Sequence, residues 1–233
     1  SQYLQNKKGK VQSVFNKVYD KYDLMNDFMS IGIHRLWKKD MINWMAPYPK
    51  KKLIDMACGT GDIGKLFLEN TNYEGKVLFI DPNLKMLKKG MDRLKNHKNI
   101  SWKKGSAEKI PAPSNFFDYY CISFGLRNTK NINKSLKEAF RVLKPGGRFF
   151  CLEFSKVDNE ILSFVYENYS KILPKIGKII LGKSAPYEYL IESIKKFKSQ
   201  EELKKIMIDN KLIEVEFRNL SGGIAAIHSG WKI

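Results

Sequence analysis

The residues with the clearest chemical potential form a short glycine turn between a predicted strand and a predicted helix. The turn, CGTG at residues 58–61, follows an apolar strand predicted at residues 52–57. Small residues let the backbone approach a ligand closely, and ligands of open α/β sheets bind at the carboxyl ends of the strands. Asp81 ends the next predicted strand, where a carboxylate can accept hydrogen bonds from two ribose hydroxyls. The pairing predicts a nucleotide-type ligand.

The spacing of this turn fits two ligand classes. A dinucleotide-binding turn has a third glycine, and Gly64 stands at that position. Asp55, which precedes the glycines, suits instead a ligand with cationic ammonium and sulfonium groups, because a carboxylate would repel a pyrophosphate. We therefore favour S-adenosylmethionine, contacted by Asp55, Gly59, Gly61 and Asp81, over a dinucleotide or a tight turn without a ligand.

Strands and helices that would position these residues alternate along the chain, which predicts a parallel sheet covered on both faces. Helices are expected at residues 62–70, after Pro82 to residue 95, at 131–143 and at 200–210, and a helical pattern broken by Pro174, Gly177, Gly182 and Pro186 covers residues 158–197. The expected strands are 52–57, 76–81, 100–104, 118–124, 148–154, 213–219 and 225–232.

A chain of 233 residues accommodates one α/β domain. We divide it into a helical N-terminal cap (1–52), a cofactor-binding core (53–155), a helical lid and substrate region (156–199) and a closing helix with two strands (200–233). The three cysteines are widely spaced and show no disulfide framework or zinc spacing, so we expect no metal site and a reducing compartment.

The chain is strongly basic, with 42 Lys and Arg against 24 Asp and Glu, a net charge of +18. Three explanations compete: a genome-wide composition bias, attraction to an anionic membrane surface, and nucleic-acid binding. The third has no recognised nucleic-acid motif to support it, so no nucleic-acid partner is expected. No uncharged apolar run approaches the ~20 residues of a membrane span.

Three longer strings resemble one family. They are YDLMNDFMS at residues 22–30, followed by His34 and Trp37; SFGLRN at 123–128; and RVLKPGG at 141–147, followed by Glu153. Together they resemble the ubiquinone/menaquinone biosynthesis C-methyltransferase family over nearly the whole chain. The segments 192–203 and 226–231 are most similar to its mitochondrial branch, the 2-methoxy-6-polyprenyl-1,4-benzoquinol methylases.

The resemblance implies an α/β fold, that of the class I S-adenosylmethionine-dependent methyltransferases. This fold is Rossmann-like, with a seven-stranded, mostly parallel sheet whose last strand is antiparallel. It also implies further contacts to S-adenosylmethionine, from Thr60 in the turn, Ser106 and Ala107 near the adenine, and Ser123 at the end of the fourth strand. Many relatives have Asn or Asp where this chain has Ser106, whose hydroxyl has less reach.

By the same resemblance, Arg127, Asn128 and Tyr22 lie at the methyl acceptor. A guanidinium is effectively always charged, so we expect Arg127 to lower the pKa of the quinol and to stabilise its oxyanion rather than to act as a base. Asn128 and Tyr22 would orient the ring or relay a proton. Glu153 faces the site or forms a structural ion pair, and His34 relays a proton or simply packs near Trp37.

The expected function is therefore S-adenosylmethionine-dependent C-methylation of a polyprenyl benzoquinol in ubiquinone biosynthesis. A demethylmenaquinone methyltransferase is the alternative, and an RNA methyltransferase or a cofactor-binding scaffold of a biosynthetic complex is weaker. Expected partners are the quinol, a multiprotein ubiquinone-biosynthesis complex, an anionic membrane surface and a second copy in a homodimer. The expected location is the matrix face of the mitochondrial inner membrane, with the bacterial cytoplasm as the alternative.

Overall fold

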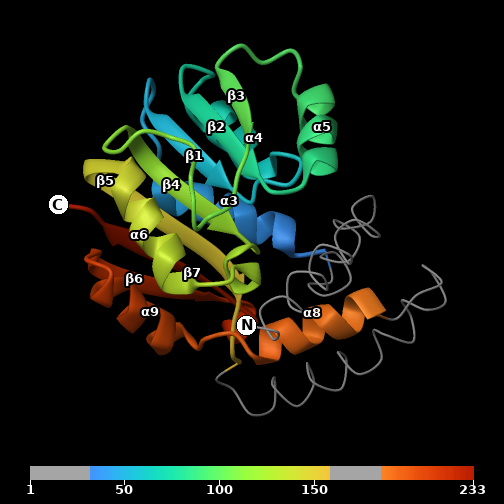
Figure 1. Ribbon diagram of the computed structural model, residues 1–233, viewed down its shortest axis with the longest axis vertical. Helices are drawn as coiled ribbons and strands as arrows, with labels where there is room; N and C mark the ends of the chain where they lie inside the picture. The colour runs from blue at the N-terminus through green and yellow to red at the C-terminus, as the bar shows by residue number, and fades with distance from the viewer. Residues whose placement is uncertain (1–31, 158–184) are drawn as a thin grey trace.

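A seven-stranded sheet forms the centre of the protein in a computed structural model, which describes residues 32–157 and 185–233 (Figure 1). The strand order is β3-β2-β1-β4-β5-β7-β6. Strand β7 runs antiparallel to both of its neighbours, whereas the pairings among β1 to β5 are parallel, which confirms the predicted fold class. The strands are β1 (Lys52–Met56), β2 (Lys76–Asp81), β3 (Ile100–Lys104), β4 (Phe117–Ser123), β5 (Leu143–Phe154), β6 (Ile213–Leu220) and β7 (Ala225–Trp231).

Helices cover both faces of this sheet (Figure 1). One apolar cluster joins α3, α4 and α8 to one face, and a second joins α6 and α9 to the other. The described helices are α3 (His34–Met45), α4 (Asp62–Asn70), α5 (Leu84–Arg93), α6 (Ile132–Val142), α8 (Ala185–Lys195) and α9 (Gln200–Asp209), with short 3-10 turns η2 (Leu126–Asn128) and η3 (Ser221–Gly223).

Strand β5 begins earlier than predicted. The helix before it ends at Val142, one residue before the predicted end at 143, and the Lys-Pro-Gly-Gly segment continues as strand instead of serving only as a stop. The register with β4 shifts here, since Phe117 pairs with Leu143 whereas Tyr119 pairs with Arg148. Gly146 has a positive φ of 78° and donates its N–H to the Lys232 carbonyl at 2.7 Å. The bulge therefore absorbs the extra residues.

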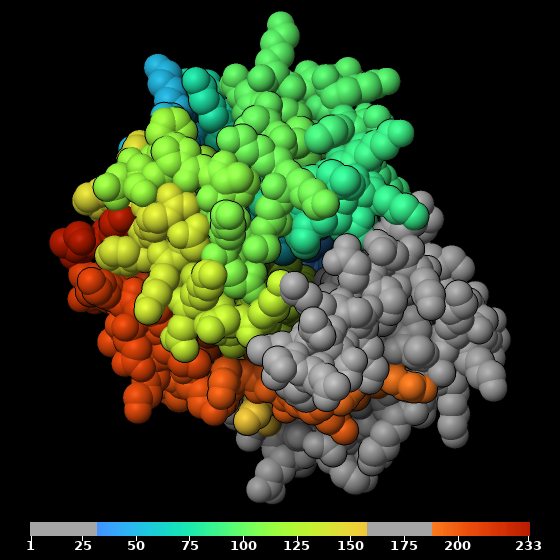
Figure 2. Space-filling view, viewed as in Figure 1, coloured from blue at the N-terminus to red at the C-terminus, as the bar shows by residue number. Residues whose placement is uncertain are grey.

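Two predicted regions lie partly outside the described residues. Helix α3 belongs to the predicted cap, and α8 belongs to the predicted lid. Pro186, predicted as a break, lies in the first turn of α8, where a missing N–H costs no helical hydrogen bond. In the space-filling view, the residues of β3 and α5 lie at one end of the sheet and those of β6 and α9 at the other, as the strand order requires (Figure 2).

Candidate active site

The glycine turn links β1 to α4 at the carboxyl ends of the strands. Gly59 and Gly61 have φ values of 56° and 86°, in the left-handed region that glycine adopts without strain. The Cys58 N–H donates to the Ile80 carbonyl at 3.1 Å, and the Gly61 N–H donates to the Cys58 carbonyl at 2.8 Å. The first bond holds the turn against the end of β2, and the second closes the turn itself. Thr60 is buried within it.

Asp81 ends β2 beside this turn. The Gly59 N–H donates to Asp81 Oδ2 at 2.9 Å, and the Asn83 N–H donates to Oδ1 at 2.8 Å. Burial raises the pKa of Asp81 to about 6. A carboxylate has about four acceptor positions, so two backbone donors leave capacity for two hydroxyls. The residues present therefore fit a ribose.

Asp55 is more deeply buried than we would expect of a residue that contacts the ligand. It is 1% exposed, and it accepts hydrogen bonds from the Gly64 N–H at 3.0 Å and from Cys121 Sγ at 3.5 Å. Burial raises its pKa to about 7. Gly64 serves packing, because a Cβ there would lie 2.2 Å from Phe79 Cε1. The third glycine thus brings α4 close to the sheet, as third glycines do in dinucleotide turns, and the glycine spacing does not distinguish the two ligands.

The loop after β3 carries Ser106 and Ala107. Ser106 is half-buried, Ala107 is 4% exposed, and the Lys109 N–H donates to the Ser106 carbonyl at 3.1 Å. Arg141, the first residue of the RVLKPGG string, fixes this loop from α6. Its guanidinium donates to the carbonyls of Ile110 at 3.0 Å and Ala112 at 2.9 Å, and it pairs with Glu138 at 2.7 Å.

The end of β4 lies against the end of β1. A Cβ on Gly125 would lie 2.6 Å from the Ala57 Cβ, so only glycine permits this approach. Ser123, the last residue of β4, has a buried Oγ without a hydrogen-bond partner within residues 32–157 and 185–233. The close approach brings the η2 turn, with Arg127 and Asn128, next to the glycine turn.

Arg127 and Glu153 form a buried ion pair, with side chains 1% and 2% exposed. Arg127 Nη1 donates to Glu153 Oε1 and also to the Phe124 carbonyl at 2.9 Å. Glu153 further accepts the backbone N–H groups of Arg127 at 3.3 Å and Phe154 at 3.0 Å. Burial raises the pKa of Glu153, and the Arg127 guanidinium opposes that shift. The ion-pair interpretation of Glu153 is confirmed.

Of the other residues predicted near the acceptor, the structure describes Asn128 and His34 but not Tyr22. Asn128 Oδ1 accepts a hydrogen bond from the Tyr189 hydroxyl of α8 at 3.0 Å. Tyr22 lies outside the described residues. His34 is buried in the first turn of α3, which agrees with packing near Trp37. The sequence placed Tyr189 only in the lid region, and no local pattern marks its contact with a residue 61 positions away.

Asp62 joins three helices at the start of α4. Lys38 Nζ of α3 lies 2.7 Å from Asp62 Oδ2, and Arg93 Nη2 of α5 lies 2.6 Å from Oδ1. Both cations lower the pKa of Asp62 well below its usual range, against the effect of burial. The turn is thus tied to α3 and α5 as well as to the sheet.

Among the described residues, no group of three or more His, Cys, Asp and Glu side chains is placed to hold a metal ion. In the same residues, no helix is long and apolar enough to cross a bilayer. All three cysteines are free thiols, with Cys121 and Cys151 buried and Cys58 half-buried.

The reversed β7 of a seven-stranded sheet, the glycine turn after β1 and the carboxylate ending β2 define a class I S-adenosylmethionine-dependent methyltransferase. An S-adenosylmethionine-dependent methyltransferase from Thermotoga maritima shares this fold with a TM-score of 0.67 and 19% identity, over 95% of this chain and 99% of that one. Another from Aquifex aeolicus has a TM-score of 0.63 and 18% identity, over 84% and 89%.

The chain belongs to the ubiE/COQ5 methyltransferase family, whose model matches residues 3–232. The ubiquinone/menaquinone biosynthesis C-methyltransferase UbiE of Rickettsia akari is 47% identical over 234 residues, covering 97% of this chain and 94% of that protein. The same-named protein of Roseobacter denitrificans is 46% identical over 231 residues, covering 97% and 92%. The chain is thus an S-adenosylmethionine-dependent C-methyltransferase.

Proposed function

We propose that the chain methylates a ring carbon of a polyprenyl benzoquinol in ubiquinone biosynthesis, as a 2-methoxy-6-polyprenyl-1,4-benzoquinol methylase. The observation that carries this proposal is the buried Arg127 guanidinium, held by Glu153 beside the cofactor turn. The names of the relatives support quinone biosynthesis and cover both pathways. A demethylmenaquinone methyltransferase is therefore the second candidate.

A fixed cation suits this reaction because a ring carbon is a poor nucleophile until a neighbouring hydroxyl loses its proton. When bound, S-adenosylmethionine supplies an electrophilic methyl group on a sulfonium. Arg127 stays charged, since a guanidinium has a pKa above about 12. It lowers the pKa of the quinol hydroxyl and stabilises the phenolate oxygen. Asn128 and Tyr22 orient the ring or relay its proton, and much of the rate comes from positioning.

The proposal gives the cofactor contacts to the residues that the sequence predicted. Asp81 accepts hydrogen bonds from the ribose hydroxyls, and Ser106 and Ala107 border the adenine. The main chain at Gly59, Thr60 and Gly61 approaches the ligand, and Ser123 lies at the end of β4. The Ser123 Oγ, buried without a partner in the described residues, supports a ligand contact there. Asp55 lies beneath the turn, under α4, and adds negative charge there in its ionised form, since burial raises its pKa to about 7.

Affinity for S-adenosylmethionine should fall as the pH drops below about 6, the pKa to which burial raises Asp81. The ionised carboxylate accepts two hydroxyl protons, whereas a protonated carboxyl must donate one of its own. The ligand therefore binds the ionised form more tightly. Calorimetric titrations from pH 5 to pH 8 measure this dependence.

In Asp81→Asn the affinity should be low throughout this pH range, and the step near pH 6 should vanish. Asp209→Asn, an exposed change in α9, should keep the step. A step that survives in Asp81→Asn would show that another group, such as Asp55, carries the pH dependence.

The proposed activity is tested with labelled S-adenosylmethionine and a short-chain 2-methoxy-6-polyprenyl-1,4-benzoquinol kept reduced. A ring-methylated product, identified by mass, supports the ubiquinone reaction. Methylation of a demethylmenaquinol alone would move the assignment to the second candidate. Failure with both quinols, with S-adenosylmethionine still bound, would favour the scaffold role. Salt-dependent methylation of RNA would favour an RNA methyltransferase.

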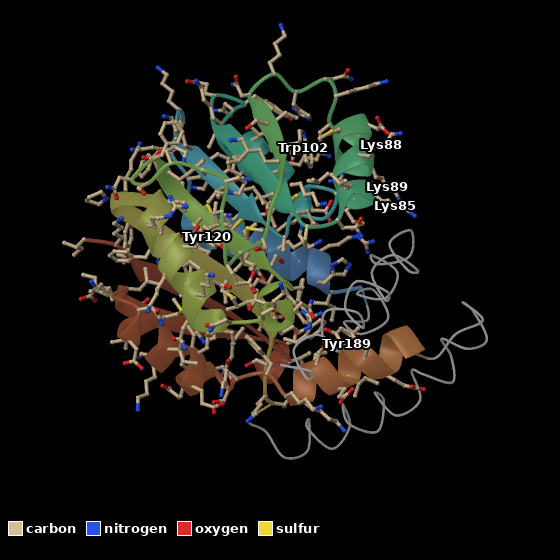
Figure 3. All side chains as sticks on the ribbon, viewed as in Figure 1. Lys85, Lys88, Lys89, Trp102, Tyr120 and Tyr189 are labelled. Carbon is tan, nitrogen blue, oxygen red and sulfur yellow. The ribbon has the colours of Figure 1, made fainter. Side chains whose placement is uncertain are left out.

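Location and partners form part of the same proposal. We propose peripheral attachment to an anionic membrane surface, at the matrix face of the mitochondrial inner membrane. Exposed lysines along α5, among them Lys85, Lys88 and Lys89, support electrostatic attraction (Figure 3). The two relatives above are bacterial, so the bacterial cytoplasm is the alternative. A homodimer and a multiprotein ubiquinone-biosynthesis complex remain proposed partners.

A further inference from the structure

Helix α8 is seated firmly beside the η2 turn. Its Leu190 is 3% exposed and belongs to the apolar cluster that contains Phe124 and Phe154. Phe124 directly follows β4 and Phe154 ends β5, so they flank the Arg127–Glu153 pair. Ile191 and Ile194 pack partly against the same cluster. Apolar contacts therefore fix α8 against the strand ends that carry the acceptor residues.

Tyr189 lies next to Leu190 and reaches the η2 turn (Figure 3). Its hydroxyl donates to Asn128 Oδ1 at 3.0 Å, in a half-buried position. An amide that accepts through its oxygen presents its NH₂ group on the other side of the same planar group. In this contact the Tyr189 hydroxyl holds the Asn128 amide with its oxygen towards α8 and its NH₂ group away from α8.

We propose that Tyr189 is a positioning residue for methyl transfer. It holds the Asn128 amide so that Nδ2 donates to an oxygen of the quinol, beside the Arg127 guanidinium. This inference rests on the proposed function, because it takes Asn128 to contact the acceptor ring. It assigns to α8 a role in the reaction that goes beyond covering the site.

A purely structural role for Tyr189 makes a different prediction. If the phenol only anchored α8, its loss would loosen the helix and lower stability without depending on Asn128. The apolar seating of Leu190 does not require the hydroxyl, so Tyr189→Phe should leave α8 in place. The two roles are therefore separable with one conservative variant.

The kinetic test compares Tyr189→Phe, Asn128→Ala and the double variant with the reduced benzoquinol. In Tyr189→Phe we expect kcat to fall about five- to tenfold, the worth of one neutral hydrogen bond, with unchanged melting temperature and unchanged S-adenosylmethionine affinity. The double variant should be no slower than Asn128→Ala, because Tyr189 acts through Asn128. Tyr73→Phe, an exposed tyrosine stacked on His97, is the matched control.

A fully additive loss in the double variant, or wild-type turnover in Tyr189→Phe, would overturn the inference. Wild-type turnover in Asn128→Ala would overturn it as well, while leaving the methyltransferase assignment intact.

A readout independent of catalysis separates this inference from the proposed function. The side-chain amide resonances of Asn128, identified by their loss in Asn128→Ala, should shift in Tyr189→Phe and stay in place in Tyr73→Phe. An unshifted pair would contradict the positioning role even in an active enzyme. If neither quinol is methylated, the proposed function fails, and the resonances still report whether Tyr189 holds the amide.

Discussion

Replacing Arg127 by lysine should lower kcat for quinol methylation about a hundredfold or more, the usual loss when one oxyanion-stabilising donor is removed. The guanidinium donates to both Glu153 and the Phe124 carbonyl, and in the proposed reaction it must also stabilise the phenolate. A lysine is a point charge without this fork and cannot keep all of these contacts at once. Turnover at saturating S-adenosylmethionine measures the loss.

The loss should be specific to the site. Arg218→Lys makes the same change on β6, where the arginine is exposed and lies over the Trp44 ring at 4.1 Å, and it should keep normal turnover. Calorimetry should find unchanged S-adenosylmethionine affinity in both variants. Near-normal methylation by Arg127→Lys would exclude the guanidinium as the stabiliser of the phenolate.

Replacing Glu153 by glutamine should lower the free energy of unfolding by on the order of 3 kcal/mol. Glutamine keeps the shape of the side chain but removes the counter-charge that Glu153 supplies to the Arg127 guanidinium, whose side chain is 1% exposed. Breaking one side of a buried pair costs more than the pair itself contributes, because the remaining charge stays desolvated. Urea unfolding at neutral pH measures the difference.

Glu216→Gln is the matched control for this change. Glu216 is exposed on β6, and surface substitutions of this kind alter stability by less than about 0.5 kcal/mol. Equal stability of Glu153→Gln and the wild type would mean that Glu153 is already protonated in the folded protein and gives Arg127 no counter-charge.

Local signals predicted the sheet well. Strands β2 and β3 and helix α4 have the predicted bounds. Turn residues lie directly beside two of these segments, with Gly61 before α4 and Pro82 after β2. The early start of β5 was missed because it depends on pairing with Lys232, far along the chain. The sequence pattern reveals the Lys-Pro-Gly-Gly turn, but it does not reveal that the segment around Lys232 pairs with this turn.

The site residues also divide into those found from local sequence signals and those whose contacts are known only from the fold. Asp81 and the glycine turn stand at strand ends and were found from sequence, and Asp81 does hydrogen-bond to the turn. The Arg127–Glu153 pair and the Tyr189–Asn128 contact join residues on different elements. Residue types indicated that Glu153 could form an ion pair, but only the fold identifies its partner. The ligand contacts of all the predicted cofactor residues, Asp81 and the glycine turn included, stay predictions.

The pairing of Asp62 with Lys38 and Arg93 has a consequence for affinity. Ordering a loop on ligand binding costs conformational entropy, which lowers affinity. Here cations from α3 and α5 hold the first residue of α4 in the folded protein, so the turn is preorganised before the ligand arrives. Residues outside the predicted set of cofactor contacts thus help to set how tightly S-adenosylmethionine binds.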